Sequence, residues 1–345
     1  MRYWKVVAAG VSCCCLLAVA WAVQNASPVT GQWVIDGRVA DGKVELTLHG
    51  NRGEHGHFSS SSMLPLQQLR GLSYEQMNSA GTNVRFEIVR DAGTLVCEGY
   101  FKSGNGAGAF TFSPDSRFVS EMQSLGYAGL PADTVFSMAV HDVTLAYARD
   151  LRALGIDRVS SDQLIAMRVH DVSIEYIRDM KALGYHELTP DNLIAMRIHG
   201  VSTEFAKELK ILGYNPSIDQ MVAMRIHGVT PEFARELKAL GYSPSVDQMV
   251  AMRIHDVTAE FAKELKALGY GAVSPDQMVA MRIHGAGIDF VKDVRSLGYT
   301  PTIDQIVSMR IHDVTPEYIR NLQARGMKNL TIDQLVSLKI HGIQD

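Results

Sequence analysis

The chain has 345 residues, of which 46% are apolar, so it is long enough to bury the cores of two domains. Its formal net charge is −4, and its 33 Lys and Arg residues are interleaved with 37 Asp and Glu residues. This balance leaves no basic stripe for a nucleic acid backbone, so we expect no nucleic-acid partner.

Residues 1–22 have the pattern of a secretory signal peptide. Arg2 and Lys5 precede an apolar run, and Ala20-Trp21-Ala22 offers a small-x-small cleavage site. The alternative is an uncleaved anchor, because the apolar run from Val6 to Val23 approaches the length that spans a bilayer. We therefore expect a periplasmic or secreted protein, or else one whose only membrane contact is this segment. Three of the four cysteines lie here and only Cys97 follows, so the processed chain can form no internal disulfide.

Residues 28–113 alternate polar and apolar side chains and are punctuated by glycine turns, which predicts a small antiparallel β-domain. About six strands are expected, in a sandwich or an open barrel. The predicted strands are Gln32 to Val39, Val44 to His49, His57 to Met63, Val84 to Arg90, Thr94 to Phe101 and Ala109 to Phe112. Turns are expected at Asp91 to Gly93 and at Ser103 to Gly108.

Two sets of residues in this domain could bind a ligand. His49, His55 and His57 are the densest metal-capable cluster, but they lie around a glycine-rich loop and no second zinc motif matches them. We therefore predict no metal and keep these three histidines only as the candidates for one. The aromatic residues could stack on sugars if they were exposed, although such rings are more often part of a core. They are Trp33, Tyr100, Phe101 and Phe110.

Residues 114–345 repeat with a period of 28 or 29 residues. One histidine recurs in every repeat: His141, His170, His199, His227, His255, His284, His312 and His341. A constant period in this range is typical of a solenoid, in which stacked repeats share one continuous core. The sequence thus predicts an α+β chain in which the β-domain is followed by an α-solenoid of about 7.5 repeats.

Each repeat contains two similar halves, and each half predicts one short helix. In the repeat around Thr230, Ser217 to His227 forms the first half and Thr230 to Leu240 the second. Each half begins with a hydroxyl residue that can cap a helix, and most end at Gly, or at Asp after the histidine, which suits a left-handed cap. Counting from Asp115, we expect about sixteen helices. The first helix of each repeat should be sandwiched between neighbours, and the second should be half-exposed.

Two features of the array could serve an interaction. The recurrent arginines could bind an acidic partner, although they could equally be structural, because a cation complements the last turn of a helix. These are Arg197, Arg225, Arg253, Arg282 and Arg310. The last helix, with Leu335 and Leu338, could form an exposed docking end unless the preceding helix covers it. The histidine ladder is expected to end helices rather than to bind metal.

Two units carry a resemblance to a known family. They are Ile-Ala-Met-Arg-Ile-His-Gly-Val at 194–201 and Val-Thr-Pro-Glu-Phe-Ala-Arg-Glu-Leu-Lys-Ala-Leu-Gly-Tyr at 229–242. They resemble helical repeats appended to bacterial beta-lactam-sensor-type membrane metallopeptidases and found in exported relatives. The resemblance covers about two-thirds of the chain, and the peptidase part has no counterpart here. It implies an array for sensing or interaction outside the cytoplasm, without proteolysis, and it assigns no ligand.

The sequence shows no nucleophile elbow, Walker loop, dinucleotide fingerprint or H-E-x-x-H motif, so we predict neither an enzyme nor a cofactor. The expected function is a scaffold or sensing module that binds a protein or peptide of the cell envelope through the repeat surface. The alternative is a module centred on the β-domain that binds an envelope polymer or a small ligand.

Overall fold

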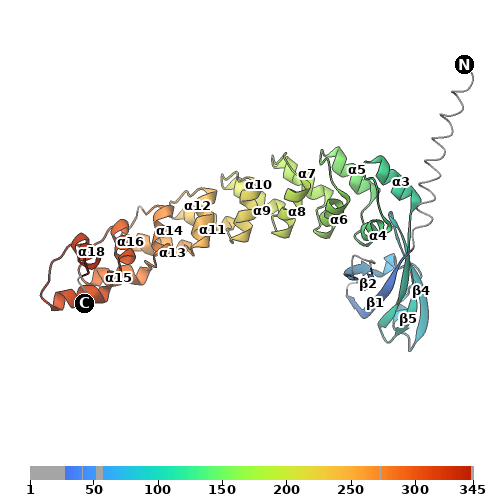
Figure 1. Cartoon of the computed structure of the whole chain (residues 1–345), viewed down its shortest axis with the longest axis horizontal. Coiled ribbons are helices and arrows are strands. Elements are labelled where there is room, and N and C mark those ends of the chain that lie inside the picture. The colour runs from blue at the N-terminus through green and yellow to red at the C-terminus, as the bar shows by residue number, and fades with distance from the viewer. Residues whose placement is uncertain (1–27, 41, 52–56, 272, 343–345) are drawn as a thin grey trace, which may run out of the picture. The chain divides into compact units, whose positions relative to one another are not determined.

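The computed structural model describes residues 28–40, 42–51, 57–271 and 273–342, in which strands precede a long series of helices (Figure 1). Six antiparallel strands form one sheet in the order β3-β2-β1-β6-β5-β4. The strands are β1 (Val29–Ala40), β2 (Lys43–Asn51), β3 (His57–Pro65), β4 (Thr82–Arg90), β5 (Gly93–Lys102) and β6 (Asn105–Pro114). The predicted α+β class is therefore confirmed, and all six strands belong to a single open sheet.

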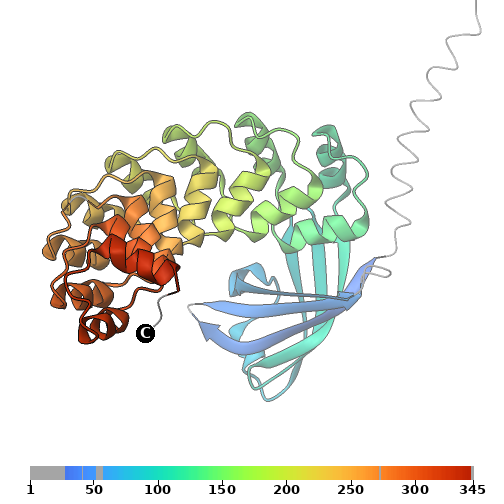
Figure 2. The ribbon, with the colours of Figure 1, turned by 60° about the vertical axis from the view of Figure 1, so that its left-hand side comes forward.

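The sheet buries one face only. Inward side chains alternate with exposed ones, and Trp33, Phe86 and Phe101 fill the centre of the buried face. The Trp33 ring meets Phe86 edge-on at 5.0 Å between centroids and lies 5.6 Å from Phe101. Gly99 makes room for the indole, because a Cβ there would lie 2.6 Å from the Trp33 ring. The sheet curves strongly along its strands, as an open barrel does (Figure 2).

The connection between β3 and β4 lies at the end of the buried face and was not predicted. It contains the short helices η2 (Leu66–Gln68) and α2 (Tyr74–Met77). Ser73 and Gln76 form a capping box at α2, and Met77 is fully buried. Arg70 and Glu87 exchange backbone hydrogen bonds of 2.8 Å, so this connection pairs with the edge strand β4.

From Ser116 onward the described residues form sixteen helices of nine residues each, as the repeat predicts. The odd-numbered helices are α3 (Ser116–Ser124), α5 (Leu145–Ala153), α7 (Ile174–Ala182), α9 (Thr203–Ile211), α11 (Pro231–Ala239), α13 (Ala259–Ala267), α15 (Ile288–Ser296) and α17 (Pro316–Ala324). The even-numbered helices are α4 (Ala132–Val140), α6 (Ser161–Val169), α8 (Pro190–Ile198), α10 (Ile218–Ile226), α12 (Val246–Ile254), α14 (Pro275–Ile283), α16 (Ile303–Ile311) and α18 (Ile332–Ile340). None of the helices in the described ranges has the length and apolarity needed to cross a membrane.

Capping chemistry sets the helix lengths. At the start of α10, Ser217 and Gln220 satisfy each other's backbone N–H groups, as in most even-numbered helices. At its end His227 is the C-cap, Gly228 has a φ of 68°, and the Val229 N–H donates to the Met224 carbonyl at 2.8 Å. This is the Schellman arrangement, and it repeats at both rows of helices. Asp256 and Asp313 take the same left-handed position with a φ of 55°, which confirms the predicted use of Gly or Asp there.

The chain divides into two compact units, and the division lies within the array rather than at its start. One unit runs to Lys181 and includes His186–Ile194, so it contains the sheet and the first helices. The other comprises Ala182–Tyr185 and Ala195–Asp345, of which the described part extends to residue 342. No linker separates the sheet from the helices, because Asp115, which follows β6 directly, caps α3 through the Phe118 N–H at 2.8 Å.

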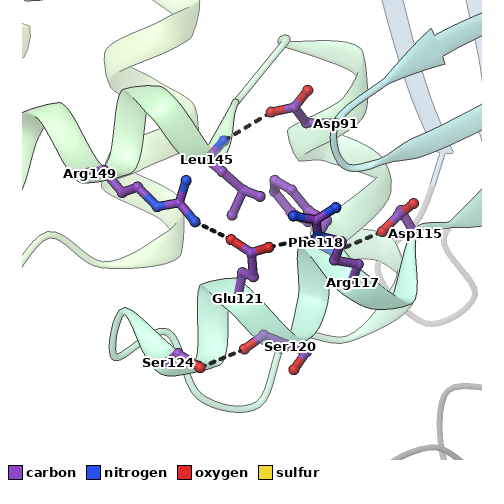
Figure 3. Close-up of polar contacts among 9 residues, drawn as sticks. All are labelled: Asp91, Asp115, Arg117, Phe118, Ser120, Glu121, Ser124, Leu145 and Arg149. Carbon is purple, nitrogen blue, oxygen red and sulfur yellow. Dashed lines mark hydrogen bonds and ion pairs between the residues drawn. The ribbon is translucent and has the colours of Figure 1, made fainter.

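Polar contacts join the sheet to the first helices within the first unit (Figure 3). Asp91, in the turn between β4 and β5, accepts a 3.2 Å hydrogen bond from the Leu145 N–H at the start of α5. Glu121 of α3 lies between Arg117, at 2.8 Å, and Arg149 of α5. These two guanidinium groups lower the pKa of Glu121, Arg117 having the larger effect through its hydrogen bond.

Candidate functional site

In the second unit, the even-numbered helices pack more closely against one another than the odd-numbered helices do. We call the solvent-facing side of the even-numbered row the inner face. In α10 it consists of Asp219, Val222, Ala223 and Ile226, one to two turns apart on one side of the helix. The opposite side of α10 buries Met221 and Met224 completely. The inner face therefore runs from a carboxylate at each helix start to an aliphatic side chain at each helix end.

The aliphatic residue at the last position of each even-numbered helix is exposed. In the second unit these side chains are 53–57% exposed: Ile198, Ile226, Ile254, Ile283, Ile311 and Ile340. Val169 holds the same position in the first unit and is 49% exposed. The prediction that these helices are sandwiched was therefore wrong. Apolar residues occur on two sides of each helix, but only the methionine side is packed.

Helix α4 shows what the inner face does when something covers it. Its nine residues align with those of α10, which places Phe136 at the position of Val222 and Val140 at that of Ile226. The β-sheet covers this face. The Phe136 ring stacks on Phe110 at 5.5 Å between centroids and meets Phe112 at 5.3 Å. In the first repeat, therefore, the inner face is in contact with the β-sheet of the same chain.

A groove lies along the inner face between α4 and α6, with a volume of about 520 Å³. Asp133 and Asp162 lie at one end of it, and His141 and His170 at the other. Between them, α4 contributes Thr134 and Ser137, and α6 contributes the apolar residues Ile165, Ala166 and Val169. The groove therefore shows, within the first unit, the acid-to-aliphatic layout that α10 shows for the second.

A larger groove of about 650 Å³ lies on the other side of the array, between α11 and α13. Its walls carry Glu232, Glu236 and Glu260 together with Arg253 and Lys263. Lys263 is paired with Glu260 at 3.2 Å. This groove is polar and has no row of exposed aliphatic residues, so it lacks the feature that distinguishes the inner face.

The arginines predicted as an interaction surface make contacts inside the array. Arg310 donates through Nε to the His284 carbonyl at 3.3 Å, and its guanidinium lies 5.0 Å from the centre of the Phe290 ring. Arg225, Arg253 and Arg282 stack in the same way on Phe205, Phe233 and Phe261. Arg197 has the equivalent position in α8 and is half-buried. The Nε atoms of Arg225, Arg282 and Arg310 donate to the C-cap carbonyl of the preceding even-numbered helix, where a positive charge is favourable. These contacts support the repeat, and the predicted interaction role of the arginines stays a prediction.

Acidic residues form a regular row at the starts of the even-numbered helices. The Gln220 amide donates to Asp247 at 2.9 Å, and Gln248 and Gln277 donate to Asp276 and Asp304 at 3.0 Å. Each bond joins one repeat to the next and uses one carboxylate oxygen. The row comprises Asp219, Asp247, Asp276, Asp304 and Asp333, all of them exposed.

The other predicted candidates lie elsewhere. Leu335 is only 1% exposed and belongs to the last apolar cluster, against which Leu338 packs, because α17 and its flanking residues cover this end. Three of the four aromatic residues proposed for sugar stacking are core: Trp33, Phe101 and Phe110 are at most 1% exposed. Only Tyr100 is open to solvent, at 48%.

The remaining candidates concern metals and thiols. His49 and His57 lie exposed on β2 and β3, and His55 lies outside the described residues. In the described ranges, no group of three or more His, Cys, Asp or Glu side chains could hold a metal ion. Cys97 is fully buried, and burial raises the pKa of its thiol to about 12.

No protein-family model matches this sequence, and no curated protein matches it.

The exposed isoleucine row was missed by the sequence reasoning, although a signal for it was present. An aliphatic residue directly precedes the histidine in every repeat, at a helix position where a polar residue would cost nothing in packing. Neither its exposure nor the cover over α4 could be read from the repeat alone, because both depend on which helix side meets a neighbour.

Proposed function

We propose that this protein is a binding module rather than an enzyme, and that it holds another polypeptide on the inner face of α8 to α18. The observation that carries the proposal is the contrast between α4 and α10. The same face of the same repeat element is covered by the β-sheet in α4, whereas in α10 it presents Ile226 to solvent.

The recurrence of the exposed side chain supports this reading. Single exposed aliphatic residues are ordinary, but six of them at one helix position form a regular row of exposed apolar side chains. The isoleucines are not needed to hold the array together, because the helix caps, the buried methionines and the arginine contacts already do so. Covering the row would remove apolar surface from water, which is the main driving force for association.

We also propose that the protein acts outside the cytoplasm, in the periplasm or after secretion. The support is the signal-like segment of residues 1–22 and the resemblance of the repeats to those of sensor-type metallopeptidases. The first segment lies outside the described residues. Amino-terminal sequencing of protein recovered from the producing cells tests this: a start just after Ala22 is expected, and a start at Met1 on soluble cytoplasmic protein would contradict it.

A photo-crosslinking amino acid placed at Ile254 tests the binding function. The matched control is Ile211, which ends α9 in the odd-numbered row and is 75% exposed. In the producing cells, we expect a discrete adduct from position 254 that disappears when Ile226→Gln and Ile283→Gln flank it, and none from position 211. Equal adducts from both positions, or adducts that ignore the flanking substitutions, would show that the inner face is not the binding surface.

A further inference from the structure

The chemistry of the inner face specifies what kind of chain it fits. We propose that the bound polypeptide is an extended, basic segment in the polyproline II conformation, with an aliphatic side chain at every third residue. This inference rests on the function proposed above and names its partner class.

The spacing of the isoleucines favours this conformation. Packed helices lie about 8–10 Å apart, so the isoleucines at the ends of neighbouring even-numbered helices recur at about this interval. A polyproline II chain has three residues per turn and rises about 3.1 Å per residue, so the same face returns about every 9.3 Å. One residue in three can therefore meet Ile226, Ile254 and Ile283 in turn.

The other regular conformations fit the interval less well. A β-strand presents the same face every two residues, or about 6.7 Å, and falls out of step with the row within two helices. An α-helix returns to nearly the same face after seven residues, about 10.5 Å, and drifts from the row by about 0.5–2.5 Å at each helix, against at most about 1.3 Å for a polyproline II chain. Peptides that form a β-strand or an α-helix can therefore be tested for binding beside a polyproline II peptide.

The charge of the inner face favours a basic segment. The acidic row runs parallel to the isoleucine row, one helix length away, and its residues Asp247, Asp276 and Asp304 are exposed. Each accepts one hydrogen bond from a glutamine, which leaves the other carboxylate oxygen for a ligand. The arginines of the same helices do not pair with these aspartates, because they lie in the last turn of each helix and the aspartates lie in the first; Arg253, for example, stacks on Phe233.

These two rows together orient the ligand. In a polyproline II chain, neighbouring residues point about 120° apart around the axis. A chain with its aliphatic residues on the isoleucine row thus directs the next residue of each triplet toward one side, where lysine or arginine would meet the aspartates. The third residue of the triplet faces solvent, and proline there keeps the chain extended at low entropic cost.

Labelled synthetic peptides test the inference by fluorescence anisotropy with the chain that lacks residues 1–22. The reference peptide is five Pro-Leu-Lys triplets. We expect saturable binding that weakens at least tenfold when Glu replaces Lys, and at least tenfold when the same residues are rearranged so that Leu recurs at every second position. A heptad peptide of matched charge that forms an α-helix should also bind at least tenfold more weakly.

Protein variants locate the site. The Ile226→Gln, Ile254→Gln and Ile283→Gln triple variant should lose at least tenfold in affinity for the reference peptide, whereas Ile211→Gln should lose none. Asp247→Asn with Asp276→Asn should weaken binding of the Lys peptide but not binding of the Glu peptide, because the substitutions remove negative charge from the surface, while Glu236→Gln in α11 should affect neither peptide. Circular dichroism of each variant confirms that it remains folded.

Equal or tighter binding of the helical or the alternating peptide would overturn the proposed conformation, and equal binding of the Glu peptide would overturn the proposed charge. Absence of binding by all peptides would overturn the whole inference. The photo-crosslinking experiment then separates the two levels: an adduct at position 254 without peptide binding leaves the binding function standing and rejects this partner class. No adduct and no peptide binding would reject both.

Discussion

Helices α4 and α10 are copies of one element, yet their inner faces have opposite surroundings. Phe136 of α4 is 1% exposed and contacts three phenylalanines of the sheet, whereas Val222 at the same position of α10 is only partly buried. At the end of α4, Val140 shares a small cavity with Leu46 and Leu48, whereas Ile226 is 54% exposed.

In each repeat, therefore, one side of the even-numbered helix stabilises the array and the other side is available for contacts with a partner. Caps, buried methionines and stacked arginines recur in α10 and hold the array together without any contribution from the inner face. In α4 the arginine position is taken by the buried Ala139, and the sheet supplies the packing instead. The side chains of the inner face can therefore differ between repeats according to what they contact.

The largest expected effect comes from removing the ring that meets the sheet. Phe136→Ala should lower the free energy of unfolding of the first unit by about 3–5 kcal/mol, because a buried aromatic ring leaves a cavity. Val222→Ala, the matched change in α10, should cost less than about 1.5 kcal/mol, since its surroundings are partly solvent. Without residues 1–22, Trp33 is the only tryptophan, so its fluorescence in urea reports the sheet and the effect of Phe136→Ala. Circular dichroism, which follows the helices, reports the effect of Val222→Ala in the second unit. Equal costs for the two variants would mean that α4 and α10 are packed alike.

A smaller loss is expected from the internal arginines. Arg310→Ala removes a hydrogen bond to the His284 carbonyl and a stack on Phe290, and should destabilise the second unit by about 1–2 kcal/mol. Arg320→Ala, on the exposed side of α17, should change stability by less than about 0.5 kcal/mol. Urea unfolding followed by circular dichroism measures both. If Arg310→Ala were as neutral as its control, the arginine row would be available for a partner after all.

The isoleucine row itself should matter little to folding. Ile254→Gln should change the free energy of unfolding by less than about 1 kcal/mol, because half of the side chain is already in water. Leu237→Ala, a fully buried change in the neighbouring α11, should cost about 2–5 kcal/mol. Thermal unfolding of the two variants compares them. A cost for Ile254→Gln near that of Leu237→Ala would show that the row is needed for the fold and is not reserved for binding.

The smallest effect concerns acid sensitivity at the junction of sheet and helices. The folded state lowers the pKa of Glu121. Its carboxylate therefore stabilises the fold at pH values above its ordinary pKa of about 4.5, and this stabilisation is lost as the pH falls through the lowered pKa. Glu121→Gln should therefore reduce the fall in the urea midpoint between pH 5 and pH 3. Urea midpoints measured at half-unit pH intervals check this. If the midpoint of Glu121→Gln fell as much as that of the unaltered chain, Glu121 would not contribute to the acid sensitivity.

Most of the array could be predicted from sequence because its rules are local. A hydroxyl residue at most helix starts, joined by glutamine in most even-numbered helices, and the Gly or Asp after each histidine mark the helix boundaries by local rules. The sheet was predicted less completely. Ser103 to Gly108 was expected to be a turn, but β6 begins at Asn105, because Gly106 and Gly108 admit neighbouring groups rather than bend the chain.

The candidate site could be predicted only in part. The arginines were recognised as recurrent, but their stacking partners lie on the intervening odd-numbered helix, about twenty residues earlier, and no local rule connects them. The short helix α2 was hidden because its four residues are too few for a periodic signal. The exposed row required knowledge of which side of each even-numbered helix packs, and apolar residues on two sides gave no answer.

In the proposed function, the inner face of α8 to α18 is the surface that binds another polypeptide. Isoleucine-methyl NMR spectra of the chain lacking residues 1–22, recorded with and without the five-triplet Pro-Leu-Lys peptide, test it most directly. We predict shifts at Ile198, Ile226, Ile254, Ile283, Ile311 and Ile340, with Ile211 unmoved. Shifts at Ile211 and the odd-numbered helices, with the row unmoved, would contradict the claim.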